Sequence, residues 1–322
     1  MNTSFEFSAA AADMTDSADR VLAEKGRSFY WARHLLGPVH AARATRLYRL
    51  CRYIDDLADE GSSIALARQA LMDAAVSIRA GHSSNPILHD GLALMHECGI
   101  DADILLELIA GVQSDLESVR MPDLDSLLRY CYQVAGTVGL MMCKVLDTDD
   151  RAAFAHAVDL GIAMQLTNIC RDIAADADVD RRYLPATMVG DLAPAQLLNP
   201  TNHLRAHVQD CIGMLLDCAD TYYQSGELGL SYLPLRGRGG ILVAARVYRA
   251  IGWQLRARKQ AYLNGRVVVS AWRKAAVTSQ ALVAIPFSRF FWQHPVQHDD
   301  CLHEAFTHFP ASSTASFLCH AE

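Results

Sequence analysis

Two pairs of aspartates stand on helix faces where apolar side chains would be expected. Asp55 and Asp59 follow one apolar stripe, and Asp172 and Asp176 continue another. Side chains four residues apart share one face of a helix, so each pair repels itself unless a cation lies between its members. Carboxylates on faces without His or Cys suit Mg²⁺, which completes its ligand set with water and substrate phosphates. The pattern predicts magnesium ions and a diphosphate held in one cavity.

Other polar residues accompany the two pairs. Gln165 and Asn168 precede Asp172 on the same face, and polar side chains aligned on a buried face need partners. Arg52 and Arg171 stand beside the pairs, and a guanidinium binds phosphate through two parallel hydrogen bonds. One acidic cluster alone would be consistent with a solvated helix surface. Two clusters, each merging with an apolar stripe and each with an arginine beside it, favour a site.

The elements that must position these residues are helices. Hydrophobic residues make up 51% of the 322 residues, which excludes extensive disorder, and we find no convincing strand alternation. We expect one all-α domain over 18–292, between a flexible N-terminus (1–17) and a His-rich tail (293–322). Segments 81–100 and 177–202 are expected to be loop-like or broken. The expected helices are 18–36, 40–60, 63–80, 101–119, 123–146, 149–176, 203–225, 239–263 and 266–290.

Charge and composition restrict the partners and the compartment. The formal charge of −7 argues against nucleic-acid binding. The N-terminus does not resemble a secretory signal. Of the nine cysteines, Cys51, Cys131, Cys143 and Cys170 look like small buried hydrophobes in a reducing cytoplasm. The most apolar stretch, 275–292, is interrupted by Pro286 and Arg289. It therefore favours peripheral contact with lipid over a membrane span.

The tail carries several histidines. A metal site there is conceivable, but scattered histidines in a terminus are more typical of a flexible segment, so no role is assigned. The residues concerned are His294, His298, Cys301, His303 and His308.

Four motifs, which occur in the same order as in the squalene/phytoene synthase family, resemble that family over roughly residues 20–290. This resemblance implies an all-α isoprenoid synthase fold with a central cavity and head-to-head condensation of two prenyl diphosphates. The block GRVVVSAWRKA (265–275) resembles bacterial phytoene synthases more than squalene synthases. The motifs are CRYIDDLADE (51–60), YCYQVAGTVG (130–139), QLTNICRDIAADADVDRRYLP (165–185) and VYRAIGWQLRAR (247–258).

The resemblance also implies roles for individual residues. The four aspartates and Asn168 match metal-binding positions, and Tyr130 matches a cavity tyrosine of the second half-reaction. Tyr248 matches another active-site tyrosine. Ser28 and Phe29 match a flap-like segment that closes the site. The positions implied to hold diphosphate or metal include Arg52, Gln165, Arg171 and Arg181.

Two positions depart from the family pattern. Ala175 replaces a glutamate that usually precedes the last aspartate of the second motif. The following loop, commonly rich in arginine and glycine, is DVDR at 178–181, which leaves Arg181 as the clear match. The loop's contribution to diphosphate binding is therefore expected to be weaker, or to come from Arg182.

The expected chemistry is ionisation of one allylic diphosphate and attack on the cation by the double bond of a second. A cyclopropyl diphosphate would then ionise, rearrange and lose a proton. Mg²⁺ is the expected cofactor, with Mn²⁺ as a substitute, and phytoene formation is expected to need no NADPH. Residues 134–142 offer small side chains and methionines that suit either core packing or the lining of a prenyl tunnel.

Phytoene formation from two geranylgeranyl diphosphates is the leading hypothesis, and three alternatives stay open. Squalene or dehydrosqualene formation from two farnesyl diphosphates keeps the same chemistry. Head-to-tail chain elongation matches the DDLAD run at 55–59 but not the second motif, which starts with a single aspartate. A non-catalytic assembly factor on the same scaffold would be expected to lose the four carboxylates. Carotenoid-pathway enzymes and a membrane surface that receives the product are the expected partners.

Overall fold

The computed structural model describes residues 27–59, 61, 63–293 and 297–310, except for the side chains of residues 27 and 28. The α-helices are α2 (Arg27–Arg33), α3 (Pro38–Asp59), α4 (Ile64–Ala80), α5 (Pro86–Cys98), α6 (Ala102–Ser114), α7 (Leu124–Cys131), α8 (Thr137–Val145), α9 (Arg151–Asp178), α10 (Ala186–Val189), α11 (Pro194–Leu198), α12 (Asn202–Leu228), α13 (Leu235–Ala257), α14 (Ala271–Ala284) and α15 (Arg289–Trp292). A π-helical turn, η1 (Tyr132–Gly136), and three 3₁₀ turns, η2 (Gly229–Tyr232), η3 (Ile285–Phe287) and η4 (Asp300–Phe306), complete the list.

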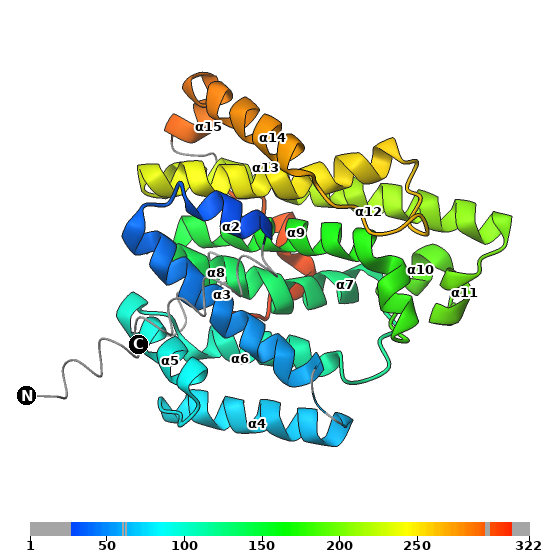
Figure 1. Ribbon diagram of the computed structural model, residues 1–322, viewed down its shortest axis with the longest axis horizontal. Helices are drawn as coiled ribbons and strands as arrows, with labels where there is room; N and C mark the ends of the chain where they lie inside the picture. The colour runs from blue at the N-terminus through cyan, green and yellow to red at the C-terminus, as the bar shows by residue number, and fades with distance from the viewer. Residues whose placement is uncertain (1–26, 60, 62, 294–296, 311–322) are drawn as a thin grey trace, which may run out of the picture.

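The helices are arranged around α9, which packs against α8, α12, α13 and the π turn η1 (Figure 1). Helix α3 packs on α5 and α8, α4 lies at one side of the molecule, and α14 lies at the opposite side on α13. The described residues contain no β-strand, and one isolated bridge joins Arg120 to Arg182. The predicted all-α fold is confirmed.

Two glycines bring α9 unusually close to the segment that precedes it. A Cβ atom on Gly139 of α8 would lie 2.1 Å from the carbonyl oxygen of Ala157, and one on Gly161 of α9 would lie 2.2 Å from that of Ala135. Both contacts are with backbone, which has little room to move. The small residues in 134–142 therefore serve packing. They also serve a cavity, since Ala135, Gly139 and Gly161 line one.

The structure corrects the expectation that 81–100 is loop-like, because α5 lies within it. The Asn85 side chain accepts hydrogen bonds from the backbone N–H groups of Ile87 and Leu88, Pro86 occupies the first turn, and Gly99 ends the helix in the left-handed region. These residues are helix-boundary signals as much as loop signals. The expected helix 123–146 is also divided, into α7, the π turn and α8. Between the end of α9 at Asp178 and the start of α12 at Asn202 lie the short helices α10 and α11, so segment 177–202 is broken, as expected.

The expectation that the tail is a flexible terminus is wrong for residues 297–310. His298 and His303 are buried, and their Nε2 atoms each lie 2.8 Å from a carboxylate oxygen of the fully buried Asp159 on α9. The buried carboxylate attracts both imidazoles and thereby fixes the segment. The expected flexible N-terminus 1–17, His294 and residues 311–322 lie outside the described residues, so the predicted domain boundaries stay predictions.

None of the described helices combines the length and the apolar composition needed to cross a membrane.

Candidate active site

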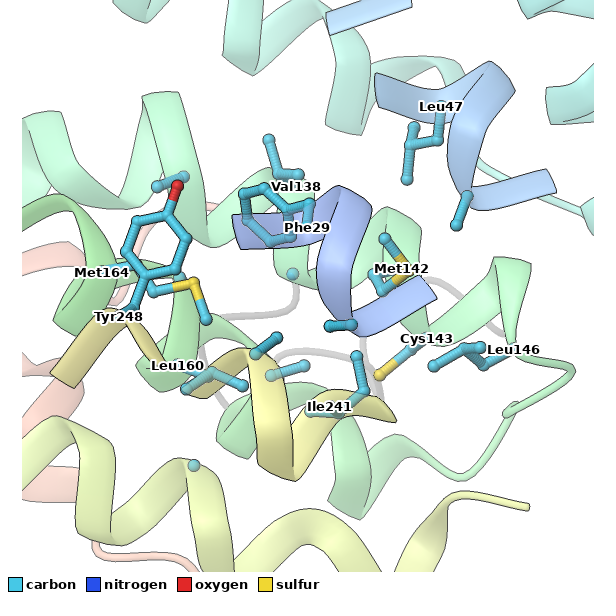
Figure 2. A pocket seen from close by; sticks show the side chains of 18 of the residues that line it. Phe29, Leu47, Val138, Met142, Cys143, Leu146, Leu160, Met164, Ile241 and Tyr248 are labelled. Carbon is cyan, nitrogen blue, oxygen red and sulfur yellow. The ribbon is translucent and has the colours of Figure 1, made fainter. Parts of the chain in front are cut away.

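An elongated, mostly apolar cavity of about 320 Å³ lies among α2, α3, α8, α9 and α13. Figure 2 shows Phe29, Leu47, Met142, Leu160 and Ile241 around it. On α9 the lining residues run from Ala153 to Asn168, a distance of about 22 Å along the helix at 1.5 Å per residue. Four polar lining residues belong to the Asn168 end, whereas Arg33 and His156 also line the cavity and His156 lies near Ala153; the four are Asp55, Gln165, Asn168 and Tyr248.

The first aspartate pair lies on the last turns of α3. Asp55 lines the cavity, and Asp59 is more exposed. Burial raises the pKa of Asp55 to about 7, and although Arg52 opposes this rise, the charge of Asp59 adds to it. Arg52 is ion-paired with Asp56 and lies 4.0 Å from Asp59. This end of α3 therefore holds more negative charge than the helix itself balances, which suits a cation.

The second pair lies on the last turns of α9. Burial by itself would raise the pKa of Asp172, but hydrogen bonds from Arg171 and Arg266 lower it overall. Burial and the charge of Asp172 together raise the pKa of Asp176 to about 7. Asp172 is thus an ionised, arginine-bound carboxylate, and Asp176 is a carboxyl group whose ionised form a nearby cation would stabilise.

Arg181 and Asp115 connect the two pairs. The guanidinium of Arg181 lies 3.9 Å from Asp59 and donates to the carbonyl oxygen of Asp115, while its backbone N–H donates to the carbonyl oxygen of Asp176. The negative charge of Asp115 raises the pKa of both Asp55 and Asp176. Arg181 and Asp115 therefore lie within reach of aspartates from both α3 and α9.

Tyr130 lies beside this space and is tied to Asp115. The hydroxyls of Tyr130 and Tyr183 donate to the two carboxylate oxygens of Asp115, at 2.8 and 2.7 Å, and the rings stack with centroids 5.0 Å apart. Burial raises the pKa of Asp115 despite these bonds, and it also raises the pKa of Tyr130. A fifth carboxylate, outside both aspartate pairs, thus holds the predicted tyrosine in place.

Asn168 has an amide oxygen directed at no protein partner. Its Nδ2 donates to Gln165 at 3.3 Å, but Oδ1 is buried and, within the described residues, accepts no hydrogen bond. A buried acceptor without a donor is costly unless a ligand satisfies it. Together with Asp55 and Asp176, this oxygen completes a donor set made of carboxylate and amide oxygens, which fits a hard divalent cation.

Two aromatic residues lie over the same cavity. Phe29 of α2 packs against Tyr248 of α13, with ring centroids 5.1 Å apart, and both line the cavity (Figure 2). Tyr248 is also within electrostatic reach of Arg171 and Asp172, so it links the apolar and the charged parts of the site. Ser28 belongs to α2, and its side chain lies outside the described residues.

Sequence reasoning misjudged one arginine and missed three other residues. Arg182 is buried and donates to the carbonyl oxygens of Met121, Leu184 and Leu192, so it is committed to the scaffold and is not available for diphosphate. Asp115, Tyr183 and Arg266 were missed because none belongs to a helical repeat of polar residues. Only folding brings them to the aspartates.

The profile of the squalene/phytoene synthase family matches residues 22–273. The chain belongs to this family. The squalene/phytoene synthase chain is 34% identical over 294 residues to the 15-cis-phytoene synthase of Enterobacter agglomerans, covering 84% of this chain and 98% of that protein. It is also 34% identical over 280 residues to the phytoene synthase of Thermus thermophilus, covering 83% and 92%.

Solved structures share the fold of this squalene/phytoene synthase. A dehydrosqualene synthase in complex with ligand superposes with a TM-score of 0.76 at 23% identity, covering 85% of this chain and 97% of that one. A squalene synthase from Alicyclobacillus acidocaldarius gives 0.66 at 20% identity, covering 76% and 94%. The predicted family and isoprenoid synthase fold are thus confirmed.

Proposed function

We propose that this prenyltransferase is a 15-cis-phytoene synthase that joins two geranylgeranyl diphosphates head to head through a cyclopropyl diphosphate. One observation carries the proposal. Asp55 lines a long apolar cavity with Gln165 and Asn168, and two relatives named 15-cis-phytoene synthase match this chain over 98% of their length. The apolar lining suits prenyl tails, since each buried methylene contributes about 0.8 kcal/mol.

The proposed cofactor is Mg²⁺, with Mn²⁺ as a substitute. The residues that would hold it are Asp55, Asp59, Asn168, Asp172 and Asp176. Bound there, it would neutralise the diphosphate and stabilise the negative charge that grows as the C–O bond breaks. NADPH is not required in this proposal, because phytoene formation ends with loss of a proton and not with addition of a hydride.

The chain's own residues supply binding and orientation. Arg52 and Arg181 border the space between the two aspartate pairs, and we propose that they hold the diphosphate. Arg171, which donates to Asp172, and Gln165, which accepts from Asn168, are proposed to bind the diphosphate as well. We assign Tyr130 to the second half-reaction.

Closure of the cavity is the second task of the protein residues. Phe29 and Tyr248 cover the ionisation end, and we propose that Ser28 belongs to the same closing segment. Excluding water there protects the cations from being quenched, and aromatic faces stabilise positive charge.

A farnesyl-based reaction that gives squalene or dehydrosqualene is the second candidate. The solved structures that share the fold carry such names, at identities that establish only the fold. The part of α9 that lines the cavity is about 22 Å long, which favours a C20 prenyl tail over a C15 tail.

We further propose that the enzyme acts in the cytoplasm and passes its hydrocarbon product to a lipid phase, beside enzymes of carotenoid synthesis. The eight cysteines that the structure describes are all free, in keeping with a reducing compartment.

The reaction is tested with purified full-length chain, Mg²⁺ and either geranylgeranyl or farnesyl diphosphate, followed by analysis of the extracted hydrocarbons. We expect a C40 hydrocarbon from geranylgeranyl diphosphate and no effect of added NADPH. A C30 product alone would move the assignment to the second candidate. Prenyl alcohols or longer diphosphates would contradict both.

Removing one carboxylate from either pair tests the site assignment. We expect Asp55→Asn and Asp172→Asn each to lower kcat at least about a hundredfold, because diphosphate departure then lacks charge stabilisation, while the helical circular dichroism stays unchanged. Asp178→Asn is the matched control, since Asp178 is an exposed aspartate on the same helix. Normal turnover in either site variant would contradict the assignment.

A further inference from the structure

Helix α14 has an apolar stripe on its outer face. Its inner face packs on α13 through Lys274, Val277 and Ala281. On the other side, Trp272, Ala276 and Val283 of α14 and Phe287 of the following turn η3 are exposed, with the exposed Ser279 and Gln280 between Ala276 and Val283. Trp272 and Phe287 each expose 88% of their surface and Val283 exposes 71%. Exposed apolar residues that occur singly need no explanation, but several large ones gathered on one helix and the turn that follows it do.

The same surface extends beyond the helix and carries one sign of charge. Phe290 and Trp292 of α15 are also exposed, and Trp31 of α2 is exposed next to α14, where its Nε1 donates to Thr278 at 3.0 Å. Residues 265–293 include four basic side chains and no Asp or Glu, in a chain of net charge −7. Three of these basic residues are exposed: Arg266, which pairs with Asp172, and Arg273 and Arg289.

This segment is connected to the active site through α2, which we call the cavity cover, and through Arg266. Trp31 lies in α2, whose Phe29 and Ala32 line the cavity. Just before α14, Arg266 pairs with Asp172. The apolar surface and the cavity cover thus lie on neighbouring helices at the same side of the molecule, opposite to α4 (Figure 1).

We propose that the outer faces of α14 and α15, with Trp31, form a docking surface for a bilayer that contains anionic lipid. Trp and Phe side chains enter the interface of the bilayer, and the arginines bind lipid phosphates. This surface deepens the proposed function, because it places the cover of the cavity against the phase that dissolves a C40 hydrocarbon. A second copy of the chain would also cover apolar groups, but the excess of positive charge opposes self-association and favours an anionic surface.

Vesicle sedimentation tests the surface with the full-length chain, without substrate or Mg²⁺. The probes are vesicles of phosphatidylcholine alone and vesicles that also contain phosphatidylglycerol. We expect binding to the anionic vesicles that weakens as salt is added. The double variant Trp272→Ser/Phe287→Ser should lose at least about tenfold in partition coefficient, since two large apolar side chains no longer enter the interface. Arg273→Gln/Arg289→Gln should lower the preference for anionic vesicles.

The matched control is Met72→Ser/Val76→Ser on α4, which also removes two exposed apolar side chains, here from the opposite side of the molecule. This control should bind vesicles like the wild type. Wild-type protein that stays in the supernatant, or a Trp272/Phe287 variant that binds normally, would overturn the proposal. A dimer in sedimentation equilibrium that this variant dissociates, without vesicle binding by the wild type, would assign the surface to a second copy. Since no reaction is measured, these outcomes are independent of the hydrocarbon assay.

Discussion

At the scale of single residues, Asp115 is the group on which the geometry around Tyr130 depends. Two tyrosine hydroxyls donate to its carboxylate, and the carboxylate interacts electrostatically with an aspartate from each pair. It touches Tyr130 and faces the predicted metal ligands without belonging to either aspartate pair. We therefore regard it as a positioning residue.

We predict that Asp115→Asn lowers kcat about tenfold to a hundredfold, because hydrogen bonds to a charged acceptor contribute about 1.5–3 kcal/mol. The cyclopropyl diphosphate should accumulate, as it should in Tyr130→Phe, and the double variant should be little worse than either single one. The measurement is single-turnover product analysis. Glu117→Gln, two residues further on and exposed, is the control. Additive losses would show that Asp115 acts independently of Tyr130.

The raised pKa values of Asp55 and Asp176, both about 7, predict how metal binding depends on pH. A carboxyl group with a higher pKa in the folded state than its usual value near 3.9 binds protons on folding, so the metal-free protein gains stability as pH falls through 7. Mg²⁺ must displace these protons. The increase in Tm on adding Mg²⁺ should therefore be larger at about pH 8 than at about pH 6, and the difference should shrink in Asp55→Asn. An equal increase at both pH values would contradict this linkage.

At the scale of the elements, the contacts of α9 with α8 and with the π turn η1 depend on two glycines. We predict that Gly139→Ala and Gly161→Ala each lower the free energy of unfolding by about 3 kcal/mol, because the added Cβ meets a backbone carbonyl near 2 Å. Gly213→Ala is the control, since it lies inside α12 with its nearest neighbour at 3.9 Å, and it should stabilise by about 0.5–1 kcal/mol. Urea unfolding measures all three. Equal effects at the three positions would show that the close approach is unimportant.

The helix faces that carry the aspartate pairs were predictable because their chemistry is local. Asp55 and Asp59, like Asp172 and Asp176, repeat at the period of a helix, so the sequence alone places each pair on one face. Helix α5 was not predicted, since Asn85, Pro86 and Gly99 are typical of loops as well as of helix boundaries. The π turn Tyr132–Gly136, which divides the expected helix 123–146, was not predicted either.

The part of the site that could not be predicted is the part made by tertiary contacts. Asp115 lies just after α6, Tyr183 in a connection and Arg266 before α14. Tyr183 reaches Asp115 across 68 residues of chain, and Arg266 reaches Asp172 across 94. No periodic pattern relates such positions. The same reason explains why His298 and His303 gave no signal, since Asp159 lies within an apolar stretch of α9 far away in the sequence.

At the scale of the whole molecule, the segment 297–310 closes the fold. Asp159 accepts hydrogen bonds from His298, His303 and Ser225, which brings the last described part of the chain onto α9 and α12. The two imidazoles lower the pKa of Asp159 despite its burial, and the carboxylate raises the pKa of His298 despite its burial. Asp300 also faces His298, and the neutral form of His156 is favoured by burial. The segment therefore depends on one buried, compensated charge.

We predict that His298→Gln/His303→Gln lowers the free energy of unfolding by about 3–5 kcal/mol, because it leaves the Asp159 carboxylate buried without a charged partner. Asp159→Asn added to this variant should restore part of the loss. His308→Gln, which replaces an exposed histidine of the same segment, should change the free energy of unfolding by less than about 0.5 kcal/mol.

The raised pKa of His298 also predicts how stability depends on pH. The contribution of His298 to stability is complete below about pH 6.5 and is lost as pH rises through the folded value, whereas the contribution of Asp159 is lost only in acid. Urea unfolding between about pH 6 and pH 9 should therefore show a loss of stability in the wild type that Asp159→Asn does not share. Parallel pH profiles would mean that this buried pair does not hold the segment in place.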